Sequence, residues 1–454
     1  MMNDKFNTAA TAKKWSYVLV STPGMRDAFN SEQELAGVMQ AFHAKLLKMG
    51  LIVPPPLGGK RLLLNGPDDP KLVQTIQGAA AVLDLLFVLL PDANTPVYYK
   101  VKQLADIKYG IHTICSVGQK LAKPGGQDQY FANLGLKFNL KLGGINQTVD
   151  TARLGLINDN KTMVVGIDVT HPSPGSSSAA PSVAGMVASI DRWLGQWPAT
   201  LRIQPARQEN VADLTSMLKS RLQLWKTKGK HPSFPENILV YRDGVSEGQY
   251  STVIDSELPL LRKAAKELYP ATEQKKGLPR FTIVIAGKRH KTRFYPTQAQ
   301  DADPKSANPK PGTVVDRHVT EPRNWDFFLQ AHNALKGTAR PCHYYVVLDE
   351  IFRQTYKTVP PQYPGGNVSD ILEDLTHSMC YLFGRATKAV SLCPPAYYAD
   401  IVCERARHYL INVFESPAPS AAASAVASDV AGGRSADNDD ILIHPKLRDS
   451  MFYL

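Results

Sequence analysis

Two aspartates occupy positions from which carboxylates can bind metal ions. Asp168 lies inside the apolar run 163–169, which is typical of a strand, and Asp243 comes just beyond a second predicted strand at 238–241. A buried carboxylate is costly unless a cation or hydrogen-bond donors compensate its charge. Carboxylates held close together also repel, and a pair of divalent metal ions that cleaves phosphodiesters is a common solution. The alternative is structural: Asp168 pairs with a basic residue, and Asp243 caps a helix that begins near Ser246.

A second set of residues has the chemistry to bind a phosphate and a base. Lys137 and Lys141 are four residues apart on a predicted helix, so both ammonium groups leave the same face. Like charges at this spacing destabilise a helix, and a bound phosphate would offset that cost. Tyr98 and Lys102 have the same spacing on the preceding predicted helix, which puts a cation beside an aromatic ring that can stack on a base. The alternative is a solvated lysine face.

The net charge of the chain is concentrated around these lysines. The 454 residues include 52 Lys and Arg against 41 Asp and Glu, a net charge of +11. Residues 100–141 alone carry seven lysines and two aspartates, a net charge of +5. A local cationic field of this kind indicates a phosphate-bearing partner.

Composition excludes several classes of protein. With 43% hydrophobic and 20% charged residues, the chain has the composition of a globular protein. The polar amino terminus lacks the apolar core of a signal peptide, and the longest apolar stretch, 79–90, is too short to span a bilayer. The five cysteines form no C-x-x-C pair, so we expect buried free thiols and a reducing, cytoplasmic location, with the nucleus as the alternative.

The predicted elements place the two sets of residues in two different folds. In the first 142 residues strands alternate with helices, which favours a doubly wound parallel sheet with ligands at the carboxyl ends of its strands. The predicted strands are 16–21, 51–53, 83–90 and 112–117. The predicted helices are 32–46, 70–79, 97–108 and 130–142.

A different pattern begins after the glycine pair 143–144. Predicted strands at 163–169, 183–190 and 200–204 precede a long amphipathic helix at 208–228 and the strand at 238–241. This is the opening order of a ribonuclease H-like fold, although a generic mixed α/β domain fits nearly as well. Residues 416–440 consist mainly of Ser, Ala, Pro, Gly and Asp, so we expect a disordered insertion there.

Several segments together resemble the Argonaute family. The segments 166–172 (GIDVTHP), 241–249 (YRDGVSEGQ), 288–293 (KRHKTR) and 395–399 (PAYYA) resemble the PIWI domain of eukaryotic Argonautes. The segment 137–144 (KFNLKLGG) looks like the end of the preceding MID domain, and the low-complexity insertion is similar to that of a fungal, quelling-type Argonaute. The resemblance implies a Rossmann-like MID domain at 1–142, followed by a ribonuclease H-like PIWI domain at 143–454.

The resemblance implies a small-RNA-guided endoribonuclease, a slicer of RNA silencing that cleaves by two-metal hydrolysis. Its catalytic set falls on Asp168, Glu209, Asp243 and Asp400, where many animal relatives have histidine at the last position. Asp168, Asp243 and Asp400 are the expected metal ligands. Carboxylates suit Mg²⁺, the expected cofactor, and Mn²⁺ is expected to substitute for it.

The resemblance also implies where the guide strand binds. The expected site for the guide 5′ end consists of Tyr98, stacked on the first base, with Lys102, Thr113, Lys137 and Lys141 around the phosphate. Animal relatives carry a glutamine just before the cysteine of this strand, where this chain has Ile114. Ile114 cannot donate a hydrogen bond, so we expect the neighbouring Thr113 to substitute for the glutamine. Arg385 and Arg405 match positions that contact the guide backbone.

Full-length relatives carry an amino-terminal domain and a PAZ domain that residues 1–15 cannot supply, so we interpret the chain as a carboxyl-terminal half. Its expected partners are a guide RNA with a 5′ phosphate, a complementary target RNA and silencing-complex proteins, and no membrane. One alternative is a scaffold that binds guide RNA and silences through partner proteins without cleaving. Another is an unguided ribonuclease, which leaves the lysines of 100–141 unexplained.

Overall fold

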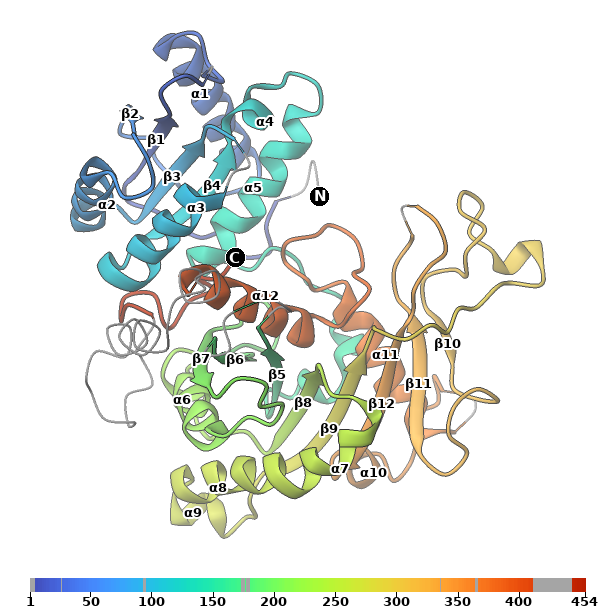
Figure 1. The fold of residues 1–454 in the computed structure, drawn as a ribbon. Coiled ribbons are helices and arrows are strands. Elements are labelled where there is room, and N and C mark those ends of the chain that lie inside the picture. The colour runs from blue at the N-terminus through green and yellow to red at the C-terminus, as the bar shows by residue number, and fades with distance from the viewer. Residues whose placement is uncertain are drawn as a thin grey trace. The chain divides into compact units, whose positions relative to one another are not determined.

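The computed structural model describes residues 5–25, 27–92, 95–172, 176, 180–334, 336–363, 366–410 and 443–454. Within it the chain forms two compact units (Figure 1). The first unit comprises residues 1–147 and 405–454, and the second comprises residues 148–404. The predicted division of function at residue 142/143 stays a prediction. The predicted disordered insertion at 416–440 lies outside the described residues.

The first unit contains a parallel sheet in the order β2-β1-β3-β4. Its strands are β1 (Trp15–Ser21), β2 (Gly59–Leu63), β3 (Leu85–Leu90) and β4 (His112–Val117). Its helices are α1 (Glu32–Lys48), α2 (Pro70–Val82), α3 (Thr95–Lys102), the π-helix η1 (Gln103–Tyr109), α4 (Gly118–Ala122) and α5 (Gln127–Lys141). The doubly wound parallel sheet predicted from the alternation of elements is confirmed.

Both faces of this sheet are covered, as the apolar run of β3 predicts. Side chains alternate between the faces of a strand, and Phe87 belongs to a core with α1 and α5, whereas Val88 belongs to a core with α2, α3 and η1. Helices therefore cover both faces of the sheet, and all six side chains of β3 are buried. This explains why β3 has no polar residue.

One predicted strand of this unit is wrong. Residues 51–53 form only an isolated bridge between Ile52 and Thr11, and the edge strand is β2 (Gly59–Leu63) instead. The prolines at 54–56 follow directly and cannot donate to a ladder. β2 escaped detection because only Leu62 of its five residues is buried, so the strand lacks an apolar pattern.

The second unit contains a mixed sheet in the order β10-β11-β12-β9-β8-β5-β6-β7. Its strands are β5 (Thr162–Thr170), β6 (Ser182–Ala188), β7 (Ala199–Gln204), β8 (Asn237–Asp243), β9 (Arg280–Gly287), β10 (Thr313–Val315), β11 (Trp325–Gln330) and β12 (Cys342–Asp349). β5, β6 and β7 are antiparallel, and β8 then joins β5 in parallel after a helix. This is the predicted ribonuclease H-like order.

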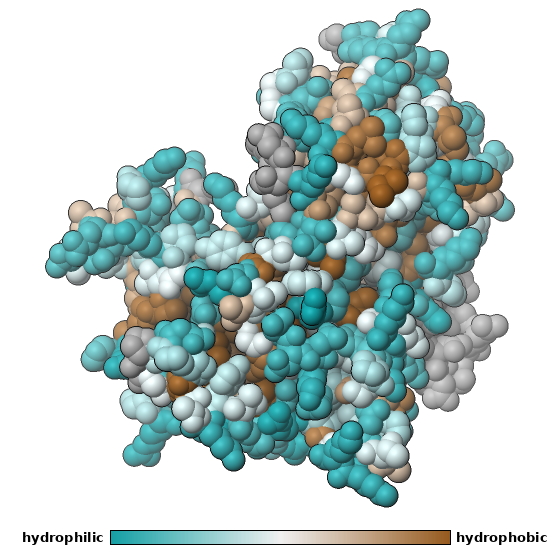
Figure 2. Space-filling model, turned by 180° about the vertical axis from the view of Figure 1, so that it is seen from behind, coloured by the Kyte–Doolittle hydropathy of each residue, from teal (hydrophilic) through white to brown (hydrophobic). Residues whose placement is uncertain are grey.

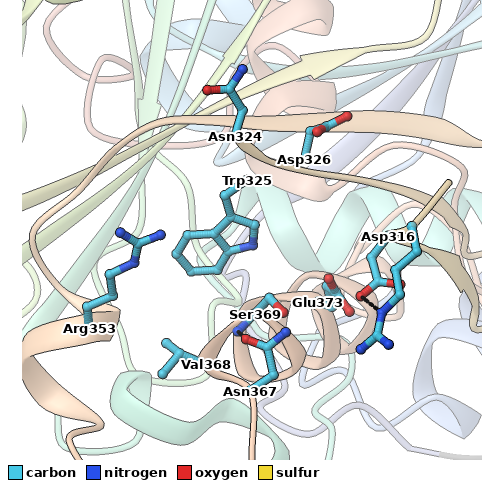
Figure 3. A pocket seen from close by; sticks show the side chains of 10 residues that line it. Asp316, Asn324, Trp325, Asp326, Arg353, Asn367, Val368, Ser369 and Glu373 are labelled. Atoms are coloured by element: carbon cyan, nitrogen blue, oxygen red, sulfur yellow. Dashed lines mark hydrogen bonds and ion pairs between the residues drawn. The ribbon is translucent and has the colours of Figure 1, made fainter. Parts of the chain in front are cut away.

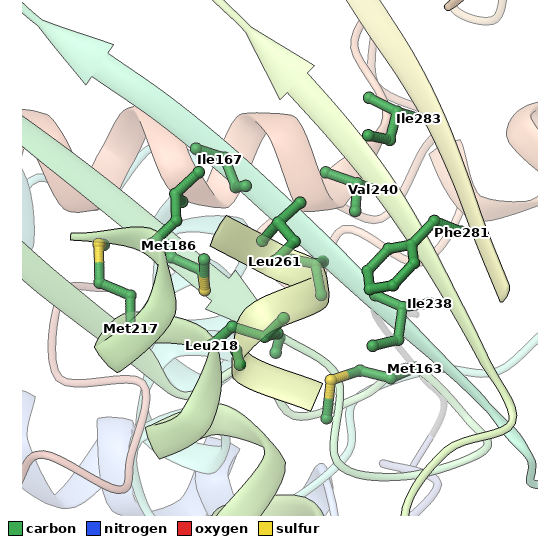
Figure 4. Close-up of a cluster of buried hydrophobic side chains, with 14 of the residues drawn as sticks. Met163, Ile167, Met186, Met217, Leu218, Ile238, Val240, Leu261, Phe281 and Ile283 are labelled. Carbon is green, nitrogen blue, oxygen red and sulfur yellow. The ribbon is translucent and has the colours of Figure 1, made fainter. Parts of the chain in front are cut away.

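Helices cover both faces of this sheet. The helices along this part of the chain are η2 (Thr151–Ile157), α6 (Leu214–Thr227), η3 (Glu247–Gln249), α7 (Tyr250–Thr252), η4 (Val253–Glu257), α8 (Leu258–Leu268), α9 (Ala271–Gln274), η5 (Ala299–Asp301), α10 (Phe352–Thr355), α11 (Val368–Cys380) and α12 (Pro394–Tyr409), which extends past the end of the unit at residue 404. α6 and α8 contact each other over an apolar core that includes Ile167 and Val240 of β5 and β8 (Figure 4). The helix predicted at 208–228 begins later, at Leu214, because Arg207 adopts a positive φ of 59° and the residues after it form a loop.

The face drawn in Figure 2 is largely polar, with hydrophilic side chains around apolar patches. In the described part of the chain, the helices are all too short or too polar to cross a membrane.

Candidate functional site

Four basic side chains of the first unit, which we call the cation cluster, gather beside the carboxyl end of α5. Lys102 ends α3, Lys137 and Lys141 leave the last turns of α5, and Arg405 comes from α12. Lys102, Lys141 and Arg405 are 1%, 1% and 5% exposed, so three cations are buried in one place. Burying like charges together is costly unless anions or hydrogen bonds compensate them.

One buried carboxylate, Asp106, opposes these cations. It lies on η1, a π-helix that continues α3 directly, and such helices are frequent at functional sites. Its Oδ2 is 3.0 Å from the Nη1 of Arg405 and accepts a hydrogen bond of 2.7 Å from the Tyr409 hydroxyl. Burial alone would raise the pKa of Asp106, but the charges of Lys102, Arg405 and Lys141 lower it below its ordinary value. Asp106 is therefore ionised, and one negative charge faces three buried cations.

The lysines are held by backbone and hydroxyl oxygens. The ammonium of Lys102 donates to the carbonyl of Thr113 at 2.9 Å and to its Oγ1 at 2.7 Å. The ammonium of Lys141 donates to the carbonyl of Phe452. Burial, followed by the charge of Lys102, places the pKa of Lys141 well below its ordinary value. Such a shift reports a cation that lacks sufficient negative charge around it.

Tyr98 adjoins the same cluster. Its hydroxyl accepts a hydrogen bond of 3.0 Å from Arg405, and the charged groups of Lys102 and Arg405 both lie 5.8 Å from its ring centroid. The Nε of Arg405 is buried and has no hydrogen-bond partner among the described residues. A buried guanidinium donor without an acceptor is where an anionic oxygen would fit.

The structure thus brings together five of the residues predicted for the guide 5′ end, which are Tyr98, Lys102, Thr113, Lys137 and Lys141, with Lys137 acting on the pKa of Lys141. Arg405, predicted to contact the guide backbone, lies in this cluster. The sequence analysis missed Asp106 and Tyr409. The spacing of four residues that relates Lys102 to Asp106, and Arg405 to Tyr409, was the available signal.

The predicted catalytic carboxylates lie in the second unit, and we call Asp168, Asp243 and Asp400 the carboxylate cluster. Ile167 of β5 pairs with Arg242 of β8, and the two strands are parallel. The residues that follow, Asp168 and Asp243, therefore lie side by side at the same end of the two strands. Asp400 comes from α12, which packs on β5 and β6.

Two glycines bring α12 close enough to complete this cluster. A Cβ on Gly166 of β5 would lie 1.9 Å from the carbonyl oxygen of Pro395, and one on Gly185 of β6 would lie 2.8 Å from the Cys403 sulfur. A third glycine, Gly244, has φ +80° in the turn after Asp243. An L side chain rarely adopts that conformation, so the turn that ends β8 requires glycine.

Burial acts on all three carboxyl groups, and repulsion by neighbouring carboxylates acts on two of them, Asp243 and Asp400. Burial raises the pKa of Asp168. Burial, followed by the charges of Asp168 and Asp400, raises the pKa of Asp243 to about 7. Burial and the charges of Asp168 and Glu404 raise that of Asp400 to about 6. Raised pKa values in a group of neighbouring acids mean that negative charge is in excess, which a divalent cation would correct.

The fourth predicted member, Glu209, is not part of this group. Its Oε2 lies 2.9 Å from the Nε2 of His171, at ion-pair distance but without hydrogen-bond geometry, and its side chain is 44% exposed. Ser182 holds both sides of this pair, since its hydroxyl contacts the Nδ1 of His171 at 2.8 Å and accepts from the Arg207 amide at 2.9 Å.

A buried ion pair fixes the loop that carries Glu209. Arg242 and Glu257 are almost completely buried and lie 3.0 Å apart. The guanidinium of Arg242 also donates to the carbonyl of Glu209 at 2.9 Å and to that of Asp243, while Glu257 accepts from the Val211 amide. Sequence reasoning missed this pair, although Arg242 adjoins Asp243 and stands inside an apolar strand.

The described residues contain one acidic group compact enough for all its ligand atoms to lie within 4.8 Å of one another, and it is a different one: Asp316, Asp370 and Glu373. The carboxylate cluster is therefore more open. Two metal ions in one site are 3.5–4 Å apart, so ligands spread over a wider span suit a pair of ions. All-oxygen donors with excess negative charge fit Mg²⁺ or Mn²⁺.

The remaining predicted residue, Arg385, follows α11 in the second unit. It is half-buried, and its charge lowers the pKa of the buried Tyr398, which burial raises overall. The structure assigns it no contact that distinguishes a guide-binding role.

Known proteins resemble this chain in sequence and in fold. The Piwi domain model matches residues 85–410. Protein argonaute 5 of Arabidopsis thaliana is 38% identical over 353 residues, covering 74% of this chain and 33% of that protein. Protein argonaute 2 of Oryza sativa subsp. japonica is 38% identical over 327 residues, covering 72% of this chain and 29% of that protein. The chain thus spans about a third of the length of these curated relatives.

Solved structures of Argonaute proteins are also similar to this chain. The MID–PIWI domains of N. crassa QDE-2 are 33% identical, with a TM-score of 0.68 over 99% of this chain and 100% of that chain. The C-terminal lobe of a budding yeast Argonaute is 25% identical, with a TM-score of 0.82 over 99% of this chain and 87% of that chain. With the Piwi match over most of its length and a MID–PIWI structure aligned end to end, the chain belongs to the Argonaute family.

Proposed function

We propose that this chain binds the 5′ phosphate of a guide RNA in its first unit and cleaves paired target RNA in its second. The observation that carries the proposal is the carboxylate cluster, where the buried Asp168 and the half-buried Asp243 and Asp400 lie near one another with raised pKa values. A folded protein keeps such an excess of negative charge chiefly where a bound cation uses it.

The guide end of the proposal rests on the cation cluster. Three buried cations face one carboxylate, Asp106, and the Nε of Arg405 has no acceptor among the described residues. A terminal phosphate supplies both the missing charge and the missing acceptors. Tyr98 lies at hydrogen-bond distance from Arg405, so a base that follows the phosphate could stack on its ring.

Two divalent metal ions, preferably Mg²⁺ with Mn²⁺ as substitute, would activate a water and stabilise the leaving oxygen. The chain contributes the groups that hold and place them. Asp168, Asp243 and Asp400 would be the ligands, and the Arg242–Glu257 pair fixes the backbone of Asp243 and of Glu209. Glu209 would have to leave His171 to join the other acids.

A similar protein supports the guide part of the proposal. Kluyveromyces polysporus Argonaute, solved with a guide RNA, is 26% identical and has a TM-score of 0.81 over 99% of this chain and 51% of that chain. The target RNA, silencing-complex proteins as partners, and a cytoplasmic location also belong to the proposal. The free cysteines, of which four are buried, suit a reducing compartment.

Guide binding is tested with one short RNA that carries either a 5′ phosphate or a 5′ hydroxyl, at two salt concentrations. We expect tighter binding of the phosphate form, weakened about tenfold or more in Lys141→Ala, since a charge-assisted hydrogen bond contributes about 1.5–3 kcal/mol. The matched control is Lys120→Ala, because Lys120 is exposed in the same lysine-rich segment. Equal affinity for both ends would contradict the guide-anchoring proposal.

Cleavage is tested separately, with a guide and a paired target in Mg²⁺ or Mn²⁺. We expect cuts at one fixed position that Asp168→Asn reduces about a thousandfold, because metal ions supply several kcal/mol of transition-state stabilisation. Asp159→Asn, on the surface, is the matched control. Cuts that persist in Asp168→Asn would overturn the metal assignment, and scattered cuts without a guide would indicate an unguided ribonuclease.

The second candidate function is a scaffold that binds guide RNA and silences through partner proteins without cleaving. The contact between Glu209 and His171 favours it, because this contact keeps one predicted catalytic carboxylate outside the cluster. Selective binding of the 5′ phosphate without cleavage of the paired target would support the scaffold.

A further inference from the structure

A polar pocket of the second unit lies among residues that the proposed function does not use. It has a volume of about 240 Å³ and is lined from β11, α11 and the segments that precede them (Figure 3). Its lining residues include Asp316, Trp325, Asn367, Ser369 and Glu373. Figure 3 shows Trp325 between Arg353 on one side and Asp316 and Glu373 on the other.

Three carboxylates converge beside this pocket, and we call Asp316, Asp370 and Glu373 the acidic triad. Asp316 directly follows β10, and Asp370 and Glu373 lie three residues apart near the start of α11, so they share one face. The ligand atoms of the triad all lie within 4.8 Å of one another. Two ligands on opposite sides of one Ca²⁺ ion, at 2.3–2.6 Å each, would be separated by about this distance.

The position of α11 explains only one of these acids. The helix begins after Asn367, whose Oδ1 accepts from the Ser369 amide, and an acid such as Asp370 in the first turn is stabilised by the helix dipole. Glu373 lies one turn further, where this effect has faded, and it is 6% exposed. Helix capping therefore does not account for a buried glutamate at that position.

Glu373 is also unsatisfied. Its Oε1 is buried and has no hydrogen-bond partner among the described residues, and the same holds for the Nε1 of Trp325 and the Oγ of Ser369. Buried polar atoms normally have a hydrogen-bond partner, so three unpaired polar atoms around one pocket indicate that the pocket binds a ligand. A cation would satisfy Glu373, and water bound to that cation would accept from the Trp325 indole.

The charges around the pocket also favour a cation. Asp326 is already held by His343 at 2.7 Å, and the three carboxylates of the acidic triad outnumber the two guanidinium groups near the pocket, those of Arg317 and Arg353. Arg317 approaches Asp316 only to 3.8 Å, and Arg353 lies over the Trp325 ring at 5.5 Å from its centroid. Among the described residues, neither arginine forms a hydrogen bond with the Oε1 of Glu373.

We propose that Asp316, Asp370 and Glu373 bind a hard divalent cation, Ca²⁺ or Mg²⁺, at a site separate from the carboxylate cluster. The donor set is entirely oxygen, which hard cations prefer over the nitrogen and sulfur ligands of zinc. The site joins β10 to the start of α11, so the ion would stabilise this part of the second unit. The inference does not depend on guide binding or cleavage.

Terbium luminescence tests the site directly, because Tb³⁺ occupies sites for hard cations and is sensitised by a nearby indole. Trp325 lines the pocket, whereas the other tryptophans of the chain do not. We expect saturable sensitised emission from the whole chain, with affinity reduced about tenfold or more in Glu373→Gln and in Asp316→Asn. Trp325→Phe should remove most of the emission while leaving metal affinity, measured by calorimetry, unchanged. Competition with Ca²⁺ and with Mg²⁺ then identifies the ion.

The double variant Asp168→Asn, Asp243→Asn is the matched control, since it removes two acids from the other cluster. It should keep the Tb³⁺ signal. Emission that is absent, unchanged in both triad variants, or lost only in the double variant would overturn the proposal. Circular dichroism and thermal unfolding of each variant verify folding, and the half-buried Asp316 provides the test if Glu373→Gln does not fold.

Discussion

The cation cluster of the first unit and the carboxylate cluster of the second are both buried groups of like charge, but they are assembled differently. Lysine and arginine reach the cation cluster on long side chains from α3, α5 and α12, and backbone and hydroxyl oxygens already hold several of them. The aspartates are short, so their backbones have to come close instead. That approach requires glycine at 166 and 185, where α12 packs on β5 and β6.

The two clusters also differ in internal compensation. The cation cluster contains its own counter-ion, Asp106, which pairs with Arg405. In the carboxylate cluster, Arg242 is already committed to Glu257, and the charges of Arg289 and Lys288 act without an ion pair to the three aspartates among the described residues. We infer that the first cluster is organised before its ligand arrives, whereas the second stays open and partly protonated until cations bind.

The largest expected effect comes from removing the internal counter-ion of the cation cluster. Asp106→Asn leaves Arg405, Lys102 and Lys141 buried without a negative charge, and breaking a buried ion pair costs about 3–5 kcal/mol. We expect the free energy of unfolding, measured in urea, to fall by that amount. Added inorganic phosphate should restore part of it in the variant by binding among the cations. No loss of stability would show that the cluster is solvated.

The second prediction concerns pH. The pKa of Asp243 is raised from 3.8 to about 7 by burial, Asp168 and Asp400, so the folded protein binds a proton more tightly than the unfolded chain does. Stability from this group is therefore present below about pH 4 and is lost as the pH rises toward 7. Without divalent cations, we expect the free energy of unfolding to fall over this range by on the order of 3 kcal/mol.

Asp243→Asn distinguishes this cause from general acid effects. The variant cannot ionise at that position, so its stability should depend less on pH between 4 and 7 than that of the wild type. Urea unfolding with a chelator present, at the two ends of the range, measures the difference. Equal pH dependence in both proteins would mean that burial and the neighbouring carboxylates do not raise the pKa of Asp243.

Much of the fold and part of the candidate site could be predicted from the sequence, because these features depend on local patterns. The alternation of elements predicted the parallel sheet, and an aspartate inside the apolar strand around Asp168 identified one catalytic candidate. The edge strand β2 was missed because its exposed side chains carry no apolar period. The start of the long helix was placed too early, since the loop around Arg207 is fixed by contacts with distant residues.

The parts that escaped prediction are contacts between segments far apart in the chain. Asp106 and Arg405 are separated by 299 residues, and Glu209 meets His171 only through the loop held by Ser182. No local spacing encodes such pairs. The acidic triad escaped for the same reason, because Asp316 and Glu373 come from separate elements and neither lies in a recognisable motif.

A smaller effect is expected from the close packing that short aspartates require. Gly166→Ala places a Cβ 1.9 Å from the Pro395 carbonyl oxygen, so α12 has to shift. Overpacking of this kind typically costs about 1–3 kcal/mol. Because Asp400 lies on α12, the shift should also displace this carboxylate, so we expect the cleavage rate to fall by more than the loss of folding free energy alone would cause. Gly78→Ala, on the exposed side of α2 with open space around it, is the matched control: it should leave cleavage unchanged and, because alanine favours a helix interior over glycine, raise stability by about 0.5–1 kcal/mol.

The smallest effect on stability is expected at Glu209, and it sharpens the contrast with Asp106. The Glu209–His171 contact is partly exposed, and exposed ion pairs contribute about 0–1 kcal/mol. Glu209→Gln should therefore change the free energy of unfolding by less than about 1 kcal/mol. If Glu209 joins the carboxylate cluster during cleavage, the same variant should nevertheless lose most of its cleavage activity while its affinity for guide RNA stays unchanged. Activity that survives the substitution would mean that Glu209 only holds its loop to His171, and that the three aspartates act without it.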